Sequence, residues 1–336
     1  MTPEAVTPKA MTPGAMAREG ATSDAMTSDA MAPAAVTPDA LATTPAAAFA
    51  PFAAFADLHR AGASPFLIPN AWDHASASVL AAQGFPAIGT TSLGVAAAAG
   101  LPDGAGATRA ETLLLARRLG PGPYLLSVDA ESGFSDDPDE VAGLARELAD
   151  AGAVGINLED GRHDGTLAPV ALHAAKVAAV KAAVPDLFVN ARTDTYWLGG
   201  GRAGEETAHR LHAYEQAGAD GVFVPGLADP AVIAALVKRL ATPLNILYTP
   251  SGPTVPQLGD LGVRRVSLGS LLFRTALGAA TEAAADIRAG RRPVAGRGPT
   301  YAQVQALSGP AHAARRPPGN GAAATDTAAG GNDAGR

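Results

Sequence analysis

The central part of this chain alternates short apolar segments with helical patterns eight times within about 220 residues. Eight strand-helix pairs match a (β/α)8 barrel better than a doubly wound sheet, which requires no such count. The pattern therefore predicts an α/β fold, a (β/α)8 TIM barrel. The predicted strands are Phe66–Pro69, Ala87–Thr90, Tyr124–Val128, Val154–Leu158, Leu187–Val189, Gly221–Val224, Leu244–Tyr248 and Arg265–Leu268. The predicted helices are Ala75–Gln83, Arg109–Leu119, Pro138–Ala151, Pro169–Ala183, Gly204–Ala217, Pro230–Leu240, Val255–Leu261 and Leu271–Arg288.

Glycine and proline mark the helix boundaries. The tripeptide Ala-Gly-Ala follows three helices, at 61–63, 151–153 and 217–219, which predicts a glycine C-cap before the next strand. Asp137-Pro138 and Asp229-Pro230 each place an N-cap residue before a proline in the first helical turn. Both signals agree with the barrel phasing.

The chain divides into three parts. Residues 1–46 form a degenerate repeat of Met, Thr, Pro and Ala, and residues 309–336 are rich in Ala, Gly and Pro, so both are predicted to be disordered tails. The barrel domain spans residues 47–308, and an initial helix, Phe52–Ala61, is expected to cap its bottom.

Composition excludes several classes of protein. The chain has no cysteine, which removes disulfides, thiolate metal sites and a cysteine nucleophile. A net charge of -7 argues against nucleic acid as a partner. No apolar run approaches the ~20 residues that a membrane span needs. The cytoplasm is the default compartment, and no secretory signal pattern is present at the start of this sequence.

Acidic residues follow two consecutive strands. Asp129 and Glu131 come after the strand that ends at Val128, and Glu159 and Asp160 end the next strand. The carboxyl ends of barrel strands meet at one mouth, and carboxylates gathered there favour a hard divalent cation. Two acids alone are better explained by a solvated loop, but the second pair favours a metal site.

Other polar residues are predicted at the same mouth. They supply one arginine to bind an anion, with hydroxyl and backbone donors beside it, as a site for a carboxylate or phosphate substrate requires. These residues are Asn70, Asp73, Thr90–Ser92, Asn190–Asp194, Asn245 and Ser267–Ser270.

Six motifs in order resemble the isocitrate lyase and phosphoenolpyruvate mutase superfamily. The similarity spans residues from about 50 to 290, the whole predicted barrel. The motifs are Pro69–Asp73, Thr90–Gly94, Gly100–Gly104, Asp129–Phe134, Ile156–Asp160 and Asn190–Asp194.

The resemblance implies a Mg2+ site, with Mn2+ as an alternative, and a small carboxylate substrate. It implies that Asp129 binds the metal directly, whereas Asp103, Glu131 and Glu159 hold it largely through water. It implies a loop that receives the substrate carboxylate, and a catalytic role for Glu159 and for Arg192, which pairs with substrate oxygens. The loop residues are Thr91, Ser92, Leu93 and Gly94, and Asn245 joins the expected substrate-binding set from its position at a strand end.

Each position has a simpler interpretation. Asp103 could be a turn residue in Leu-Pro-Asp-Gly, and Arg192 could form a structural ion pair with Asp194. Asp160 could cap a loop. Asn245 is as well explained by tying down a loop as by lining the mouth.

Departures from the superfamily restrict the chemistry. Isocitrate and methylisocitrate lyases carry a cysteine that serves as the acid, and this chain has none. The mutase carries a lysine-rich loop, but the stretch Gly161–Pro169 has no lysine. Gly226 follows Pro225 where many lyase relatives have a glutamate, and Glu131 stands where lyases often have an aspartate.

The loop at Gly161–Pro169 has the composition of a mobile lid. Gly161 and Gly165 provide hinges, and His163 provides a titratable ring. We hypothesise that His163 transfers a proton in place of the missing thiol, the alternative being a solvated loop residue.

These observations predict a Mg2+-dependent lyase that cleaves a carbon-carbon bond in a small 2-oxo or 2-hydroxy carboxylate through an enolate-like intermediate. A phosphonopyruvate or phosphoenolpyruvate mutase or hydrolase is the alternative, and a non-catalytic metabolite-binding barrel is the alternative of another class. No membrane partner is expected. The resemblance also implies a homo-oligomer, a dimer or tetramer formed by exchange of a C-terminal helix, for which only a short helix near Tyr301–Leu307 follows Arg292.

Overall fold

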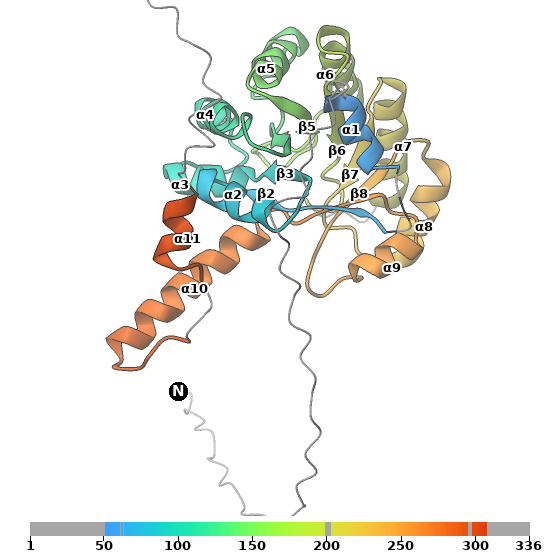
Figure 1. The fold of residues 1–336 in the computed structure, drawn as a ribbon. Coiled ribbons are helices and arrows are strands. Elements are labelled where there is room, and N and C mark those ends of the chain that lie inside the picture. Colours follow the sequence, from blue (N-terminus) through green and yellow to red (C-terminus); the bar gives the residue numbers. More distant parts are fainter. Residues whose placement is uncertain (1–50, 61, 63, 199–202, 295–297, 308–336) are drawn as a thin grey trace, which may run out of the picture. The chain divides into compact units, whose positions relative to one another are not determined.

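The strands form one parallel sheet that closes into the predicted barrel (Figure 1). The computed structural model describes residues 51–60, 62, 64–198, 203–294 and 298–307, so both predicted tails lie outside the described residues. The strands lie in the order β1 (Phe66–Ile68), β9 (Arg265–Ser267), β8 (Leu244–Leu247), β7 (Gly221–Val224), β6 (Phe188–Arg192), β5 (Ala153–Glu159), β4 (Leu125–Asp129), β3 (Ala87–Thr90) and β2 (Asn70–Ala71).

The strands β1 and β2 act as one stave. They are separated only by Pro69, and β1 pairs with β9 whereas β2 pairs with β3. The peptide N–H of Gly89 donates to the carbonyl of Pro69 at 2.8 Å, so the pairing with β3 continues through the break. Since proline has no N–H to donate, the ladder divides at this residue. The barrel therefore has eight staves.

The eight helices predicted between the strands are confirmed, with ends shifted by at most one residue. The predicted capping helix, which precedes the first strand, ends earlier than expected, at Leu58 instead of Ala61. The helices are α1 (Pro51–Leu58), α2 (His74–Ala82), α3 (Ser92–Ala99), α4 (Arg109–Leu119), α5 (Pro138–Asp150), α6 (Val170–Ala183), α7 (Ala203–Gln216), α8 (Pro230–Arg239), α9 (Val255–Asp260), α10 (Leu271–Arg288) and α11 (Tyr301–Ala306).

The helix α3 corrects one prediction, because the expected substrate-binding loop at Thr91–Gly94 contains the first turn of a helix. The alanine run that follows Val95 favours helix, and Gly100, with φ of 70°, ends it in the left-handed conformation. Thr91 is the N-cap residue of α3, but its side chain makes no capping hydrogen bond.

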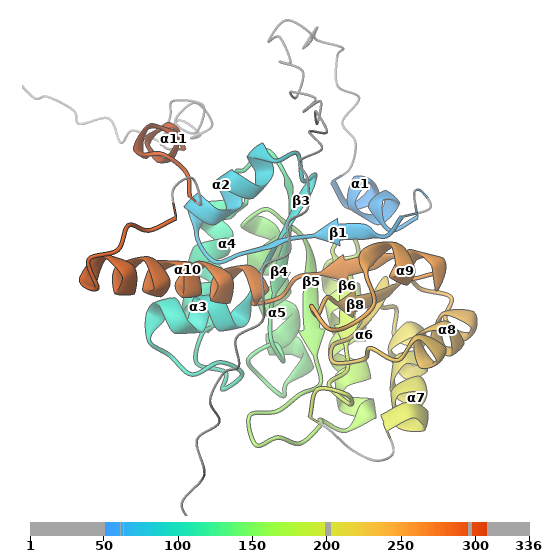
Figure 2. The same ribbon diagram turned by 90° about the horizontal axis from the view of Figure 1, so that it is seen from below.

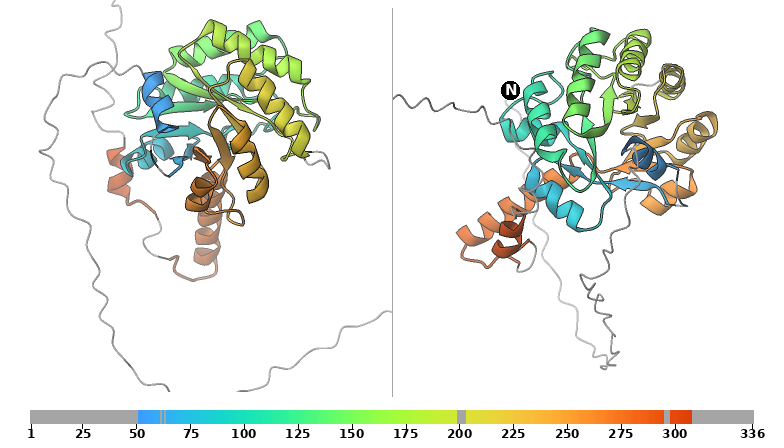
Figure 3. Two further views of the ribbon diagram at one scale, coloured as in Figure 1. Left: turned by 90° about the vertical axis from the view of Figure 1, so that its right-hand side faces the viewer. Right: turned by 45° about the horizontal axis from the view of Figure 1, so that its top comes forward.

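Most of the predicted caps are present. The side chains of Asp137 and Asp229 accept hydrogen bonds from the first turns of α5 and α8. Gly152 and Gly218 have positive φ just after the ends of α5 and α7, as predicted, whereas Gly62, also with positive φ, lies four residues beyond the end of α1 and does not cap it. Helices α5, α6 and α7 follow one another around the outside of the strands (Figure 3).

The predicted capping helix closes the amino-terminal end of the barrel. Phe55 of α1 packs edge-on against Phe66 and Phe188, with ring centroids 6.0 and 5.3 Å away, and these residues start β1 and β6. The His59 ring stacks on Phe188 at 4.3 Å. Figure 2 shows α1 next to β1. Because aromatic side chains close the barrel axis at this end, a ligand can reach the interior of the barrel only from the opposite end.

In the part of the chain that the structure describes, every helix is too short or too polar to cross a bilayer. The described part of α10 has one buried side chain, Phe273, which packs against Trp72 with ring centroids 5.3 Å apart. Leu277 and Ile287 of the same helix are exposed.

Two buried histidines are expected to make stability depend on pH. Burial lowers the pKa of His59 to about 3 and that of His173 to about 4, below the ordinary value of 6.5. The unfolded chain therefore binds protons that the native protein excludes, and the free energy of unfolding falls as the pH decreases from about 6.5 toward 4. At pH 5 the loss is about 2 kcal/mol for each histidine.

Urea unfolding at pH 7.5 and pH 5 measures this difference. The His173→Gln variant should show a pH-dependent loss smaller by about 2 kcal/mol than the parent protein. His209→Gln, at an exposed position of α7, is the matched control and should leave the loss unchanged. An equal loss in His173→Gln and the parent would contradict the expectation.

Candidate active site

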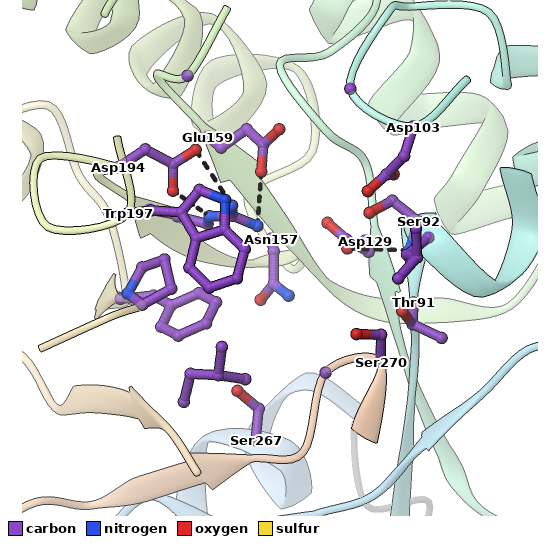
Figure 4. Close-up of a pocket in the computed structure, with 18 of the residues that line it drawn as sticks. Thr91, Ser92, Asp103, Asp129, Asn157, Glu159, Asp194, Trp197, Ser267 and Ser270 are labelled. Carbon is purple, nitrogen blue, oxygen red and sulfur yellow. Dashed lines mark hydrogen bonds and ion pairs between the residues drawn. The ribbon is translucent and has the colours of Figure 1, made fainter. Parts of the chain in front are cut away.

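A cavity of about 310 Å³ opens at the carboxyl ends of the strands (Figure 4). The sequence predicted most of its polar wall. Of the residues to which a site role was assigned, Gly94, Glu131 and Asn245 do not line the cavity, and those that do are Thr91, Ser92, Leu93, Asp103, Asp129, Glu159, His163 and Arg192. Further residues predicted at the mouth also line it, namely Asn70, Asp194, Ser267, Gly269 and Ser270, whereas Asp73, Thr90, Asp160, Asn190 and Thr193 do not.

Arg192 is fixed between two carboxylates. Its Nη1 lies 2.7 Å from Glu159 Oε2, and its Nε and Nη2 donate to the Asp194 carboxylate at 2.6 and 3.1 Å. Burial disfavours the charged guanidinium, but the charges of Glu159 and Asp194 outweigh this effect and raise the pKa of Arg192. The ion pair with Asp194 that the sequence offered as a simpler interpretation is present, and Arg192 nevertheless lines the cavity.

The carboxylates around Arg192 are costly to ionise. Burial raises the pKa of Glu159, and the nearby charge of Arg192 opposes that shift. Burial likewise raises the pKa of Asp194. The negative charge of Asp129 adds to both shifts. Acids held this close favour an additional cation.

Asp129 presents an unpaired oxygen. Its Oδ2 accepts from the backbone N–H of Ser92 at 3.2 Å, and its own N–H donates to Thr90 Oγ1 at 2.8 Å. Its Oδ1 is buried and has no hydrogen-bond partner among the described residues. A buried carboxylate oxygen without a partner is a candidate metal ligand.

Asp103 lies on the same wall. Burial raises the pKa of its carboxyl, a hydrogen bond with the Ser92 side chain opposes the shift, and the charge of Asp129 adds to it. The simpler interpretation of Asp103 as a turn residue does not account for this proximity to Asp129.

Glu131 is turned away from the cavity. The chain leaves the strand pleat here, and Glu131 has φ of 48°, a left-handed conformation that costs about 1–2 kcal/mol for a residue with a Cβ. Its carbonyl accepts from the N–H of Glu159 at 2.8 Å, and its buried carboxylate accepts from the hydroxyl of Thr108. Burial, then the charges of Asp129 and Asp103, raise its pKa. A metal contact by Glu131 therefore requires an intervening group.

These residues fit a hydrated divalent cation with few protein ligands. Among the described residues, no group of three or more acidic or histidine side chains is arranged to hold a metal directly. Mg2+ commonly keeps several waters and takes one or two carboxylates. One free Asp129 oxygen, with Asp103 and Glu159 on the same wall, matches that mode of binding.

Two predicted substrate-binding residues lie outside the cavity. Asn245 is fully buried on β8, where it pairs in register with Arg265 inside the barrel below the cavity. Gly94 lies in the first turn of α3, where a Cβ would approach Thr91 Cγ2 at 2.8 Å and Trp72 Cβ at 2.9 Å. The glycine is thus required by close packing, and neither residue reaches the cavity.

Part of the cavity wall was not predicted from the sequence. Asn157 faces inward because it lies two residues before Glu159 on β5, and the period-two alternation of a strand could have found it. Its Oδ1 accepts from Asn190 Nδ2 at 2.8 Å and from Arg265 Nη2 at 3.2 Å. The remaining residues of the wall that were not predicted to bind substrate are mainly apolar and include Trp197, Leu198, Phe223 and Leu247.

The predicted lid begins at Gly161, and a buried residue just before it, Asp160, holds both ends of the lid in place. Gly161 pairs with Leu167 in an antiparallel bridge, and exposed His163 lies between them at the mouth. Arg162 donates to Asp136 Oδ2 at 2.7 Å, which ties the lid to the loop before α5.

Asp160 is the anchor of this lid, not a loop cap. It is fully buried, and its carboxylate accepts from the N–H of Asp194 at 2.9 Å, from Arg210 at 3.1 Å and from Tyr214 Oη at 2.6 Å. Its carbonyl accepts from the N–H of Ala168 at 2.7 Å.

Comparison with known proteins gives one family. The family model described as phosphoenolpyruvate phosphomutase matches residues 55–288. The protein named Uncharacterized protein Rv1998c of Mycobacterium tuberculosis (strain ATCC 25618 / H37Rv) is 46% identical over 252 residues, covering 75% of this chain and 95% of that protein.

Two further relatives carry lyase names. The 2-methylisocitrate lyase of Bacillus subtilis (strain 168) is 33% identical over 213 residues, 59% of this chain and 69% of that protein. The crystal structure of a candidate lyase/mutase from Burkholderia cenocepacia J2315 matches with a TM-score of 0.71 and 34% identity, covering 77% of this chain and 96% of that one.

The contact between Gly161 and Asp194 yields a prediction about stability. A Cβ at position 161 would lie 2.2 Å from Asp194 Oδ2, so Gly161→Ala must displace the carboxylate that holds Arg192. We expect the free energy of unfolding to fall by about 1–3 kcal/mol, as overpacking usually costs.

Gly143→Ala is the matched control, because Gly143 lies inside α5 and a Cβ there meets nothing within 4 Å. That variant should gain about 0.5–1 kcal/mol. Urea denaturation measures both changes, and a Gly161→Ala protein as stable as its parent would show that the Asp194 carboxylate is not held in place.

Proposed function

The chain belongs to the phosphoenolpyruvate phosphomutase family, whose superfamily includes lyases and mutases, and on that premise we propose that it is a Mg2+-dependent lyase. The substrate is a small 2-oxo or 2-hydroxy carboxylate, and a carbon-carbon bond is cleaved through an enolate-like intermediate. The observation that carries this proposal is the unpaired Asp129 Oδ1 beside the clamped Arg192 in one cavity.

The metal site is proposed at Asp129, with Asp103, Glu131 and Glu159 acting through water. Mg2+, or Mn2+, supplies positive charge that stabilises negative charge developing on the substrate oxygens. Asp129 is oriented for this role because Ser92 and Thr90 fix its carboxylate and its backbone.

Two groups are proposed to bind the substrate carboxylate. The amino end of α3 carries Ser92 and Leu93 on the cavity wall, and free N–H groups at a helix start favour anions. Arg192 lies on the wall with its orientation fixed by Glu159 and Asp194, so it needs no reorganisation to meet the substrate oxygens.

The composition of the lid and of the chain disfavours both mutase chemistry and lyase chemistry that depends on a thiol. Residues 161–169 of the lid carry no lysine, and the chain has no cysteine, so neither the mutase loop nor the lyase thiol is present. His163 on the lid is then the proposed proton-transfer group. A mutase or hydrolase acting on phosphonopyruvate or phosphoenolpyruvate is the second candidate, favoured by the family match itself.

The compartment and the assembly stay predictions. The cytoplasm is the expected location. A homo-oligomer is consistent with exposed Leu277 and Ile287 on α10, and light scattering of the purified protein measures its size.

Loss of the Asp129 carboxylate should abolish the metal site. We expect Asp129→Asn to weaken Mg2+-dependent oxalate binding at least about 100-fold in calorimetry, because an amide lacks the charge that attracts the cation. Asp186→Asn, an exposed aspartate outside the cavity, should bind as the parent does. If the parent protein failed to bind oxalate with Mg2+, the non-catalytic barrel would replace this proposal.

Replacement of His163 should separate catalysis from binding. With a substrate found by release of pyruvate or glyoxylate from 2-oxo and 2-hydroxy acids, His163→Asn should lower kcat about 100-fold, because proton transfer then depends on water. Oxalate binding should stay unchanged. His209→Asn on α7 is the control, and an undiminished kcat in His163→Asn would assign His163 to solvent.

A further inference from the structure

The cavity has a polar wall and an apolar wall. Figure 4 shows Trp197 on the side away from Asp103 and Ser92. The lining beside Trp197 includes Leu198, next to it in the chain, and Phe223 and Leu247 from the ends of β7 and β8, together with the carboxylate of Asp194. The apolar part of the lining thus comes from the segment after β6 and from β7 and β8, whereas most of the charged side chains come from β4 to β6.

Two of these apolar side chains are exposed to solvent. Trp197 is 58% exposed and Leu198 is 38% exposed, although both line the cavity. Large apolar side chains inside a cavity favour a ligand that removes them from water, by roughly 25 cal/mol per Å² of buried apolar surface.

Gly226 explains why Trp197 lies at the mouth. Its φ is 81°, and a Cβ there would lie 3.1 Å from the carbonyl oxygen of Tyr196 and 3.3 Å from the backbone N of Trp197. Only glycine allows the segment at Tyr196 to pack against the end of β7. The position that relatives fill with a glutamate is therefore used here to bring an indole ring to the cavity.

The arginines of the wall are already paired. The described residues that line the cavity carry a formal net charge of −2. The charged residues are four acids, Asp103, Asp129, Glu159 and Asp194, and two arginines, Arg162 and Arg192. Arg192 is held by two of these acids, and Arg162 by Asp136 outside the cavity.

The neutral amide side chains of the lining do not change its formal net charge. The Asn70 amide is held in place, because Nδ2 donates to the Thr90 carbonyl at 2.7 Å and Oδ1 accepts from the backbone N–H groups of Leu268 and Gly269 at 3.0 and 2.8 Å. The Asn157 amide is held through Oδ1, which accepts from Asn190 and Arg265. A divalent cation brings the formal net charge to zero, and one substrate carboxylate makes it −1. A second carboxylate would meet an apolar wall and no unpaired arginine or lysine among the described lining residues, which is unfavourable.

We propose that the substrate is a monocarboxylate whose group beyond C3 is apolar, an alkyl or aryl chain that packs against Trp197, Leu198, Phe223 and Leu247. The inference rests on the proposed function, because the 2-oxo or 2-hydroxy acid end is assigned to the metal, the amino end of α3 and Arg192, which leaves no further unpaired cationic side chain among the described lining residues for a second carboxylate. It excludes a dicarboxylate as the preferred substrate.

A matched pair of ligands tests this assignment. Malate and 2-hydroxy-4-methylpentanoate differ only in that the terminal carboxylate of malate is replaced by an isopropyl group, which has the same branching and number of heavy atoms but no charge. Each competes with oxalate in calorimetry at saturating Mg2+. The isopropyl compound should bind at least about tenfold more tightly than malate. Trp197→Ala should lose most of that preference and keep its affinity for oxalate.

Leu277→Ala, which removes an exposed apolar side chain outside the cavity, is the control and should keep the preference. If oxalate fails to bind, the proposed function and this inference fall together. If oxalate binds but malate binds as tightly as its isopropyl analogue, or if Trp197→Ala keeps the full preference, the inference is overturned while the proposed function stands.

Discussion

The buried carboxylate of Asp160 holds the mouth of the barrel together. It joins β5 to the end of β6 through the N–H of Asp194, and α7 to the barrel through Arg210 and Tyr214. Arg210 also donates to the carbonyl of Ala168 at 2.9 Å, so one guanidinium fixes the end of the lid. Breaking such a buried pair by removing one partner typically costs 3–5 kcal/mol, because a charge is left uncompensated. The orientation of Arg192 therefore depends on a residue that does not line the cavity.

This arrangement separates a rigid frame from a segment that can move. Asp129, Glu159 and Arg192 belong to β4, β5 and β6, and the strand register places Glu159 directly beside Arg192. The lid residues between Gly161 and Leu167 are held at their ends by backbone bonds and along their length by the exposed ion pair of Arg162 with Asp136. An exposed pair contributes at most about 1 kcal/mol. The lid can therefore open without disturbing the charges beneath it.

The sequence was informative where a periodic pattern or a short motif determines the structure. The eightfold repeat located the strands, and the acids after Val128 and Leu158 located the polar wall. It was not informative where tertiary contacts determine the structure. The helix α3 forms from an alanine run without a capping hydrogen bond, and Asn245 is buried inside the barrel. Asp160 could not be distinguished from a loop cap, because its partners Arg210 and Tyr214 lie 50 and 54 residues further along the chain. The role of Trp197 depends on a backbone turn at Gly226.

The two walls of the cavity also rest on different parts of the hydrophobic core. Ile88, Val128 and Ile156 belong to the cluster that packs behind β3 to β6, whereas Val222, Ile246 and Val266 belong to a second cluster behind β7 to β9. Leu247 lies on β8 between Ile246 of the second cluster and Tyr248 packed against it, more than 50 residues away in sequence from the acids at Asp129 and Glu159. Phe223 is coupled to the charged centre, because the Arg192 guanidinium lies over its ring, 5.7 Å from the centroid. Effects of mutations without shared partners usually add. A change at Leu247 can therefore alter the group that the substrate carries while the charged centre keeps its geometry, whereas a change at Phe223 also alters the surroundings of Arg192.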